Sequence, residues 1–265
     1  VWTKQDGSGA VIQSSAEQGT NVTTLELDEN IFTWTVTEGG CTAVDYVTIT
    51  NNEITTIEAG DMISVCDHTA TMNANIPQTG ASGKWTTEVS DIVIDNTNYA
   101  KTAVSKLQTG SNMFTWTISK GKCSQSDNVE VANNYFTVNA GKDKAVCSTQ
   151  IKLEAVKPNA NEGGQWTRYS GQGNITTASQ YNTTVTGLGT TGENKFVWTV
   201  TNTETSCIAD DTVTIINDLP DDPSPIDDFE VCNNTAAISV STPVPALTAS
   251  GYWTVETSST AKIDD

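Results

Sequence analysis

The chain has 265 residues, of which 32 are acidic and 13 are basic, so its net charge is −19 near neutral pH. This charge disfavours nucleic acid as a partner, because binding nucleic acid needs clusters of Lys and Arg that displace counterions. Anionic membrane surfaces are disfavoured for the same reason. No signal-like segment is present and no apolar run approaches the roughly 18 residues of a membrane-spanning helix, so we expect no membrane insertion in this segment.

In chain order, the first feature is a motif that begins at Trp2 and then recurs. The first three copies contain a Trp, a Phe-x-Trp triplet, a Cys and an Asp, and the triplet Trp returns every 82 residues. A fourth copy begins with a Cys and a Trp. Self-similarity at a fixed period indicates a tandem series of like domains. The motif uses every Trp and Cys of the chain, which leaves few rare residues for a unique active site. Its members are Trp2, Phe32, Trp34, Cys41 and Asp45; Cys66, Trp85, Phe114, Trp116, Cys123 and Asp127; Cys147, Trp166, Phe196, Trp198, Cys207 and Asp211; and Cys232 and Trp253.

The register of the motif predicts four domains, which we call copies 1 to 4. Copy 1 (1–54) is a partial repeat that lacks its N-terminal strands, and copies 2 (55–135) and 3 (136–218) are whole repeats. Copy 4 (219–265) is a partial repeat that lacks its C-terminal strands. We expect the chain to be a segment of a much longer protein, whose targeting and anchoring elements lie elsewhere.

The fold prediction depends on the alternation of apolar and polar residues in segments such as 112–119. There Phe114, Trp116 and Ile118 alternate with threonines, which is typical of a half-buried strand. Each copy holds about six or seven such short segments separated by turn residues, and no helical period of useful length appears. The chain is therefore predicted to be all-β, a tandem series of antiparallel β-sandwich repeats of about 82 residues.

The two Trp residues of each copy are expected to pack in the core between the sheets. They stand in alternating strands with apolar neighbours, and aromatic side chains bury large areas. The alternative is a row of exposed aromatic rings that stack on sugars. Such rings would lack apolar neighbours in the same strand, and these Trp residues have them.

The linkers between copies are short or stiff. Asn51-Asn52-Glu53 and Asn133-Asn134 leave little slack, and residues 217–228 form a Pro-rich, acidic joint of semi-rigid character. Domains connected by such linkers are predicted to form an extended rod. The acidic joint is also a weak candidate for Ca²⁺, which prefers hard oxygen ligands, although no Asp-x-Asp-x-Asp-Gly loop is present. The candidate ligands are Asp218, Asp221, Asp222, Asp227 and Asp228.

The cysteines indicate disulfides rather than structural zinc, because no Cys-x-x-Cys pair exists and the chain has one His. Disulfides fit an oxidising, extracytoplasmic setting. Two schemes are open, and sequence alone does not decide between them. We favour bonds within a copy, since such a domain is closed by its own bridge and folds alone. That scheme pairs Cys66 with Cys123 and Cys147 with Cys207, and truncation leaves Cys41 and Cys232 unpaired. Bonds across the boundaries would instead pair Cys41–Cys66, Cys123–Cys147 and Cys207–Cys232.

Catalytic chemistry finds little support in the sequence. His68 stands alone beside Asp67 and has no counterpart in copy 3, so we interpret it as a surface His without a role. Adjacent carboxylates such as Asp210-Asp211 are numerous, but none lies on a motif that defines a pocket, and we interpret them as solvated charge. The Asp that follows the second Cys of each copy is expected to make a structural hydrogen bond, to the hairpin turn for example. No catalytic residue and no cofactor are predicted, apart from the weak calcium candidate.

The combined motif resembles the Ig-like and PKD-like repeats of very large Bacteroidota surface proteins, which include gliding-motility adhesins exported by the type IX secretion pathway. The resemblance implies export and surface exposure, and it transfers no catalytic residue. It is carried most clearly by Ala140-Gly141-Lys142-Asp143, Cys147, Gly164-Gln165-Trp166-Thr167, Val185 to Leu188, Phe196-Val197-Trp198-Thr199, Cys207 and Asp211-Thr212-Val213.

These observations predict a non-enzymatic structural and adhesive segment of a bacterial cell-surface protein, a stalk or filament for surface adhesion or gliding motility. Its partners would be neighbouring repeats of the same chain and surface glycans or other surface proteins. Two alternatives remain open. One is a glycan- or protein-binding module, and the other is a spacer region of a secreted multidomain hydrolase.

Overall fold

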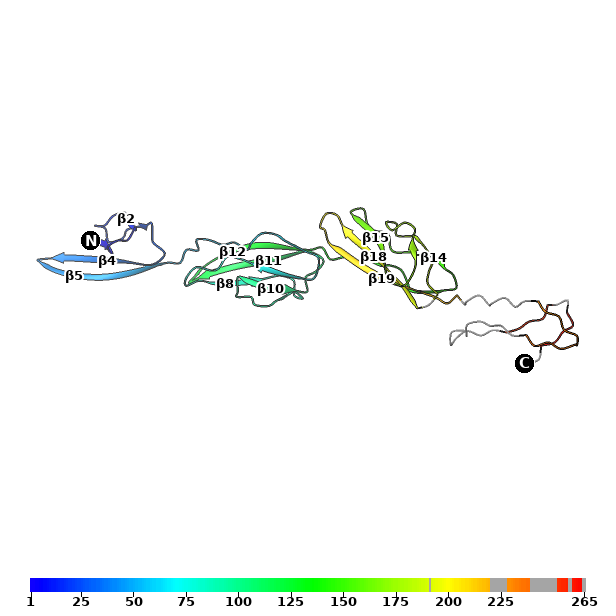
Figure 1. Ribbon diagram of the computed structural model, residues 1–265. Helices are drawn as coiled ribbons and strands as arrows, with labels where there is room; N and C mark the ends of the chain where they lie inside the picture. Colours follow the sequence, from blue (N-terminus) through cyan, green and yellow to red (C-terminus); the bar gives the residue numbers. More distant parts are fainter. Residues whose placement is uncertain (191, 220–227, 239–251, 257–258, 264–265) are drawn as a thin grey trace. The chain divides into compact units, whose positions relative to one another are not determined.

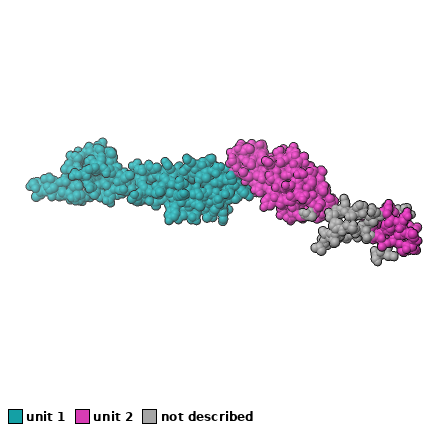
Figure 2. Space-filling model, viewed as in Figure 1, with its two compact units in different colours: residues 1–136 teal, residues 137–265 magenta. Residues whose placement is uncertain are grey.

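The computed structural model describes residues 1–190, 192–219, 228–238, 252–256 and 259–263. The chain divides into two compact units, Val1–Phe136 and Thr137–Asp265, which Figure 2 shows in different colours. Over the described residues the regular secondary structure is β-strand throughout, and no helix there could cross a membrane. The all-β prediction is confirmed, whereas the division into four copies stays a prediction.

Copy 1 holds a three-stranded sheet and a separate two-stranded ribbon (Figure 1). The larger sheet has the order β1-β4-β5, and β4 and β5 form a long hairpin that turns at Gly39-Gly40. The ribbon consists of β2 and β3. The strands are β1 (Trp2–Lys4), β2 (Val11–Ile12), β3 (Val22–Thr23), β4 (Asp28–Glu38) and β5 (Cys41–Asn51).

Copy 2 is a sandwich of a four-stranded and a three-stranded sheet, with orders β6-β12-β11-β8 and β7-β10-β9. This division of seven strands over two sheets is that of an Ig-like domain. The residues that face each other across the sheets form one buried cluster, which includes Met72, Val104 and Phe114. The strands are β6 (Ile63–Val65), β7 (Thr69–Asn73), β8 (Ser82–Thr86), β9 (Val93–Ile94), β10 (Lys101–Ser105), β11 (Gly110–Lys120) and β12 (Cys123–Asn133).

Copy 3 repeats this topology, so the prediction of tandem Ig-like β-sandwiches is confirmed for the two whole copies. Its sheets have the orders β13-β19-β18-β15 and β14-β17-β16. The strands are β13 (Lys144–Val146), β14 (Gln150–Lys152), β15 (Glu162–Ser170), β16 (Asn174–Ile175), β17 (Thr184–Thr186), β18 (Glu193–Asn202) and β19 (Ile208–Asn217).

One strand pair in each whole copy is parallel, which differs from the purely antiparallel sheets that the sequence predicts. β6 pairs with the end of β12, and β13 pairs in the same way with the end of β19. The short first strand adds to the free edge of the last strand and then crosses to the other sheet as β7 or β14. The first and the last strand of each whole copy both run toward the end of the domain where the chain leaves, so their pairing is parallel.

The Trp pairs lie where the sequence predicts, in the core. Trp85 is the cross-strand partner of Trp116, and Trp166 is that of Trp198. All four side chains are buried, and the ring centroids of the two pairs are 5.0 Å and 5.1 Å apart at tilted angles of 42° and 43°. Tilted rings at this spacing satisfy the quadrupole preference of aromatic pairs. The expectation of buried rather than sugar-stacking rings is confirmed for these pairs.

The Gly two residues before the first Trp of each whole copy provides the space for this pair. A Cβ atom on Gly83 would lie 2.2 Å from Cζ2 of Trp116, and one on Gly164 would lie 2.1 Å from Cζ2 of Trp198. Any side chain there would displace the ring. The Gly-x-Trp triplet is therefore a packing requirement rather than a turn signal.

Candidate functional site

The two cysteines of copy 2 lie at opposite ends of the domain. Cys66 directly follows β6, whose Val65 pairs with Asn133 at the end of β12, whereas Cys123 begins β12. β12 has 11 residues, and at about 3.3 Å per residue this places the two cysteines about 33 Å apart. A disulfide requires Cα atoms within about 7 Å. A bond between Cys66 and Cys123 is therefore incompatible with this fold.

Copy 3 has the same arrangement. Cys147 follows β13, whose Val146 pairs with Asn217 at the end of β19, and Cys207 directly precedes the start of β19. The last strand again separates the two sulfur atoms by the length of the domain, which excludes a bond between Cys147 and Cys207.

The states of the cysteines follow neither scheme that the sequence left open. Cys66 and Cys207 are disulfide-bonded. The remaining cysteines, Cys41, Cys123, Cys147 and Cys232, are exposed free thiols. The predicted pairs Cys66–Cys123 and Cys147–Cys207 are wrong, as are Cys41–Cys66, Cys123–Cys147 and Cys207–Cys232. Spacing along the sequence did not reveal that the first Cys of a copy lies beside the last residue of its last strand.

The recurring Asp makes a structural hydrogen bond, as the sequence predicts, but to a different partner. Oδ2 of Asp127 accepts a hydrogen bond from the backbone N–H of Ala59 at 2.8 Å, and Oδ2 of Asp211 accepts one from Ala140 at 2.8 Å. The carboxylate thus holds the Ala-Gly segment that enters the copy, not the hairpin turn. The recurrence of Ala-Gly and Asp in one motif reflects this contact.

A recurring Asn, which was not among the residues predicted from the sequence, closes the loop before the central strand in copies 1 to 3. The side-chain amide of Asn112 accepts from the N–H of Gln108 at 2.9 Å and donates to the carbonyls of Gln108 and Val131 at 2.8 Å and 3.1 Å. Asn30 and Asn194 bond their own loops in the same manner. The available signal was the triplet Asn-x-Phe, which stands in copies 1, 2 and 3.

His68 is exposed, as predicted for a surface His, but it makes local contacts at the end of copy 2 that the sequence did not predict. Its Nδ1 lies 2.7 Å from the carbonyl oxygen of Leu107 and its ring packs on Tyr135 at a centroid distance of 4.5 Å. The neighbouring carboxylate of Asp67 accepts hydrogen bonds from Oγ1 and N of Thr69, both at 2.8 Å, and these bonds lower the pKa of Asp67. These contacts order the end of the domain and provide no activated nucleophile.

The calcium candidates are only partly within the described part of the chain. Asp221, Asp222 and Asp227 lie outside the described residues. Asp218 and Asp228 are described, and the backbone N–H of Asp218 donates to the carbonyl of Val146 at 2.8 Å. Among the described residues, no group of three or more His, Cys, Asp or Glu side chains could hold a metal ion. Calcium binding by the joint stays a prediction.

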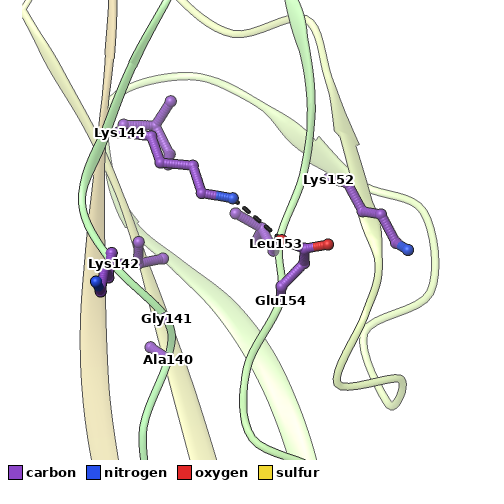
Figure 3. A pocket seen from close by; sticks show the side chains of 9 residues that line it. Ala140, Gly141, Lys142, Lys144, Lys152, Leu153 and Glu154 are labelled. Atoms are coloured by element: carbon purple, nitrogen blue, oxygen red, sulfur yellow. Dashed lines mark hydrogen bonds and ion pairs between the residues drawn. The ribbon is translucent and has the colours of Figure 1, made fainter.

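Copy 3 carries a hollow between its entering segment, residues 140–144, and residues 152–154 at the end of β14 (Figure 3). Its floor is apolar, with Leu153, Val213 and Ile215, and its rim carries three lysines. Lys144 bonds Glu154 at 3.3 Å, which neutralises part of the rim. The full lining is Ala140, Gly141, Lys142, Lys144, Lys152, Leu153, Glu154, Val213 and Ile215.

Within the first unit, the hairpin of copy 2 (residues 120–123) contacts the end of copy 1. Nζ of Lys120 lies 2.5 Å from Oδ1 of Asp28, and only 6% of the Lys120 side chain is exposed. Asp28 is the strand partner of Asn51, the last residue of β5. The next residue, Asn52, lies against Gly121, where an added Cβ would meet its side-chain amide at 2.4 Å. The last residues of copy 1 thus face the hairpin of copy 2.

The chain matches no protein-family model and no curated protein. Several solved structures resemble it. A three-Ig structure of titin domains is 11% identical with a TM-score of 0.42, covering 82% of this chain and 86% of that chain. Extracellular domains 3–5 of Drosophila OTK are 8% identical with a TM-score of 0.32, covering 75% of each. A SusE-like surface located polysaccharide binding protein from the Bacteroides thetaiotaomicron heparin utilisation locus is 9% identical with a TM-score of 0.36, covering 82% of this chain and 55% of that chain. No functional residue is transferred from these proteins.

Proposed function

We propose that the chain is a non-enzymatic structural and adhesive segment of a very large bacterial cell-surface protein, a stalk of Ig-like repeats for surface adhesion or gliding motility. The observation that carries the proposal is the use of the recurring residues. In copies 2 and 3 the Trp pair packs in the domain's own core, and the recurring Asp and Asn bond its own backbone. The recurring residues therefore stabilise the individual domains rather than form a site. A series of such domains can hold other parts of a protein away from the cell surface, which is the function of a stalk.

The bonded cysteines and the acidic surface support an exported, extracellular location. Disulfides persist in oxidising compartments and are rare where thiols are kept reduced. A net charge of −19 keeps neighbouring stalks apart by repulsion. The sequence resemblance to type IX secretion substrates agrees with this location. Antibodies raised against residues 55–218 should label intact cells that make the full-length protein. Labelling only after cell lysis would refute surface exposure.

The stalk function requires an extended chain in solution, and small-angle scattering tests this requirement. A compact globule of this length has a radius of gyration of about 18 Å. We expect a clearly larger value for a protein extended to whole repeats at both ends, because the joints between copies are short or Pro-rich. A value near that of the globule would contradict the stalk.

The hollow of copy 3 favours a second candidate function, the binding of an anionic glycan or protein. Lys142, Lys144 and Lys152 lie around an apolar floor in a chain that is otherwise acidic. Sulfated polysaccharide should then bind the chain, and replacing the three lysines by Ser should abolish binding. Replacing Lys101, Lys106 and Lys122 of copy 2 by Ser is the matched control in charge. Equal loss in both variants would indicate nonspecific attraction and exclude a site in the hollow.

A further inference from the structure

The hollow of copy 3 lies at a place that copy 2 fills with an aliphatic side chain. Lys144 pairs with Ile215 of β19. Ile63 holds the equivalent position in copy 2, opposite Val131 of β12, and its side chain packs against the buried cluster of that copy. The Lys144 side chain instead extends toward Glu154 and forms an ion pair with it at 3.3 Å (Figure 3). Copy 3 therefore lacks the aliphatic side chain that covers this part of the core in copy 2.

The floor of the hollow suits a single apolar side chain of a ligand. Leu153, Val213 and Ile215 correspond to members of the buried cluster of copy 2, and each is at most 2% exposed. A ligand would therefore gain affinity mainly by removing its own apolar group from water. The hollow has a volume of about 280 Å³, just below the roughly 300–1,000 Å³ of pockets that hold drug-sized molecules. One branched aliphatic side chain, such as the Ile at this place in copy 2, matches its size and chemistry.

The rim of the hollow favours a negatively charged ligand. Three lysines and one glutamate line it, which gives a net charge of +2 in a chain whose net charge is −19. Asp143 stands between two of these lysines in the sequence but does not line the hollow, and its carboxylate accepts a hydrogen bond from the N–H of Thr214 at 2.8 Å. The charged lining residues are Lys142, Lys144, Lys152 and Glu154, and their counterparts in copy 2 are Asp61, Ile63, Thr71 and Asn73. The positive rim thus distinguishes copy 3 from copy 2.

We propose that the hollow of copy 3 binds a peptide segment of another protein, one that places a branched aliphatic side chain next to an Asp or Glu. The proposal rests on the second candidate function, binding at this hollow, and is independent of the stalk. The aliphatic side chain takes the place that Ile63 has in copy 2, and the neighbouring carboxylate replaces Glu154 as the partner of Lys144. A sulfated glycan also pairs with the lysines, but it has no apolar group for the floor. The peptide satisfies both the floor and the rim.

Fluorescence anisotropy of a labelled peptide, titrated with the full chain, tests the class of ligand. The probe is a peptide of sequence Gly-Ser-Ile-Glu-Ser-Gly, and two related peptides have Ser in place of the Ile or Gln in place of the Glu. Each replacement should weaken binding about tenfold, because each removes one of the two contacts. Equal binding of the Ile and Ser peptides would overturn the proposal. Binding of a sulfated polysaccharide without binding of the peptide would overturn it as well, but would leave the second candidate function in place.

Two substitutions at Lys144 separate the filling of the hollow from the loss of charge. Lys144→Ile introduces the residue of copy 2 and fills the hollow, whereas Lys144→Ser removes the same charge and leaves the hollow open. Binding of the Ile peptide should be lost in the first variant and weakened about tenfold in the second. Lys157→Ser is the matched control, since Lys157 is exposed in copy 3 but does not line the hollow. Near-ultraviolet circular dichroism confirms that each variant is folded. Undiminished binding by Lys144→Ile would contradict the proposal. If neither peptide nor polysaccharide binds the parent, the second candidate function is refuted too, while the stalk is not.

Discussion

Strands β5 and β12 have the same pattern of alternating residues but differ in burial. Val129 in β12 is 2% exposed, whereas its counterpart Val47 in β5 is 41% exposed. β12 is covered by the sheet β7-β10-β9 of copy 2, to which Met72 of β7 contributes a fully buried side chain. Residues 1–54 contain counterparts of β8 to β12 but none of β6 and β7. Alternation therefore decides which face of a strand is apolar, and the opposing sheet decides whether that face is buried.

Replacement of a core Trp is expected to produce the largest difference in stability loss between copies 1 and 2. Trp116 is fully buried, and Trp116→Ala should destabilise copy 2 by about 3–5 kcal/mol. Trp34 is half-buried, so Trp34→Ala should cost clearly less in copy 1. Hydrogen exchange followed by mass spectrometry reports each copy separately. Tyr46→Ala, at a side chain that is 68% exposed, is the control and should change little. Equal costs at Trp34 and Trp116 would contradict the comparison.

A second prediction concerns the glycine that makes room for the Trp pair in a complete copy. Gly164→Ala places a Cβ against the ring of Trp198, and such overpacking should cost about 1–3 kcal/mol. Gly163→Ala is the matched control, because a Cβ at the adjacent position meets nothing within 4 Å. Urea unfolding of copy 3, followed by near-ultraviolet circular dichroism, measures both. A Gly163→Ala variant as unstable as Gly164→Ala would show that strand propensity, not the ring contact, is responsible.

Replacing the loop asparagine should destabilise copies 1 and 2 by similar amounts, unlike the replacement of a core Trp. Asn30 and Asn112 are both buried and make equivalent bonds to their loops. Replacement of either by Ala should cost about 0.5–1.5 kcal/mol, the net value of such hydrogen bonds. Exchange of the amides in the preceding loop measures the effect. A loss in copy 2 alone would mean that the bond depends on the second sheet.

The smallest effect is a pH dependence of copy 2 that arises at Asp67. Hydrogen bonds from the hydroxyl and the N–H of Thr69 lower the pKa of Asp67 below its ordinary value of 3.8. Because the folded pKa is lowered, the stabilisation is present above the unfolded pKa and is lost as pH falls through the folded pKa. Thr69→Val removes the hydroxyl and should raise the pKa of Asp67, as measured by carboxyl NMR titration. A pKa of Asp67 at or above its ordinary value in the parent would contradict this account.

The sequence was sufficient for features that depend on local pattern. The buried faces that carry Phe114 and Trp116, and the structural role of Asp127, follow from periodicity and from recurrence. The bond from Asp127 to Ala59 joins residues 68 positions apart, and its partner was not predictable without the register of the sheets. The prediction of the disulfide pairs was wrong for the same reason. The position of Cys66 depends on the parallel pairing of β6 with β12, which the sequence did not reveal. The register between strands that are distant in the sequence is set by the packing of the whole core. The sequence of a single strand does not specify it.

That parallel pairing determines how a whole copy responds to a pulling force. Tension on the two ends of copy 2 draws β6 toward the start of the domain and β12 toward its end. The strands must therefore slide past each other, and the bonds between Ile63–Val65 and Val131–Asn133 break together rather than one after another. The additional bond from the N–H of Asn134 to the carbonyl of Val65, at 2.8 Å, carries load in the same direction. Copy 3 has the same shear geometry between β13 and β19. Each whole copy is thus expected to resist stretching along the chain far better than the peeling apart of its β11–β12 or β18–β19 hairpin.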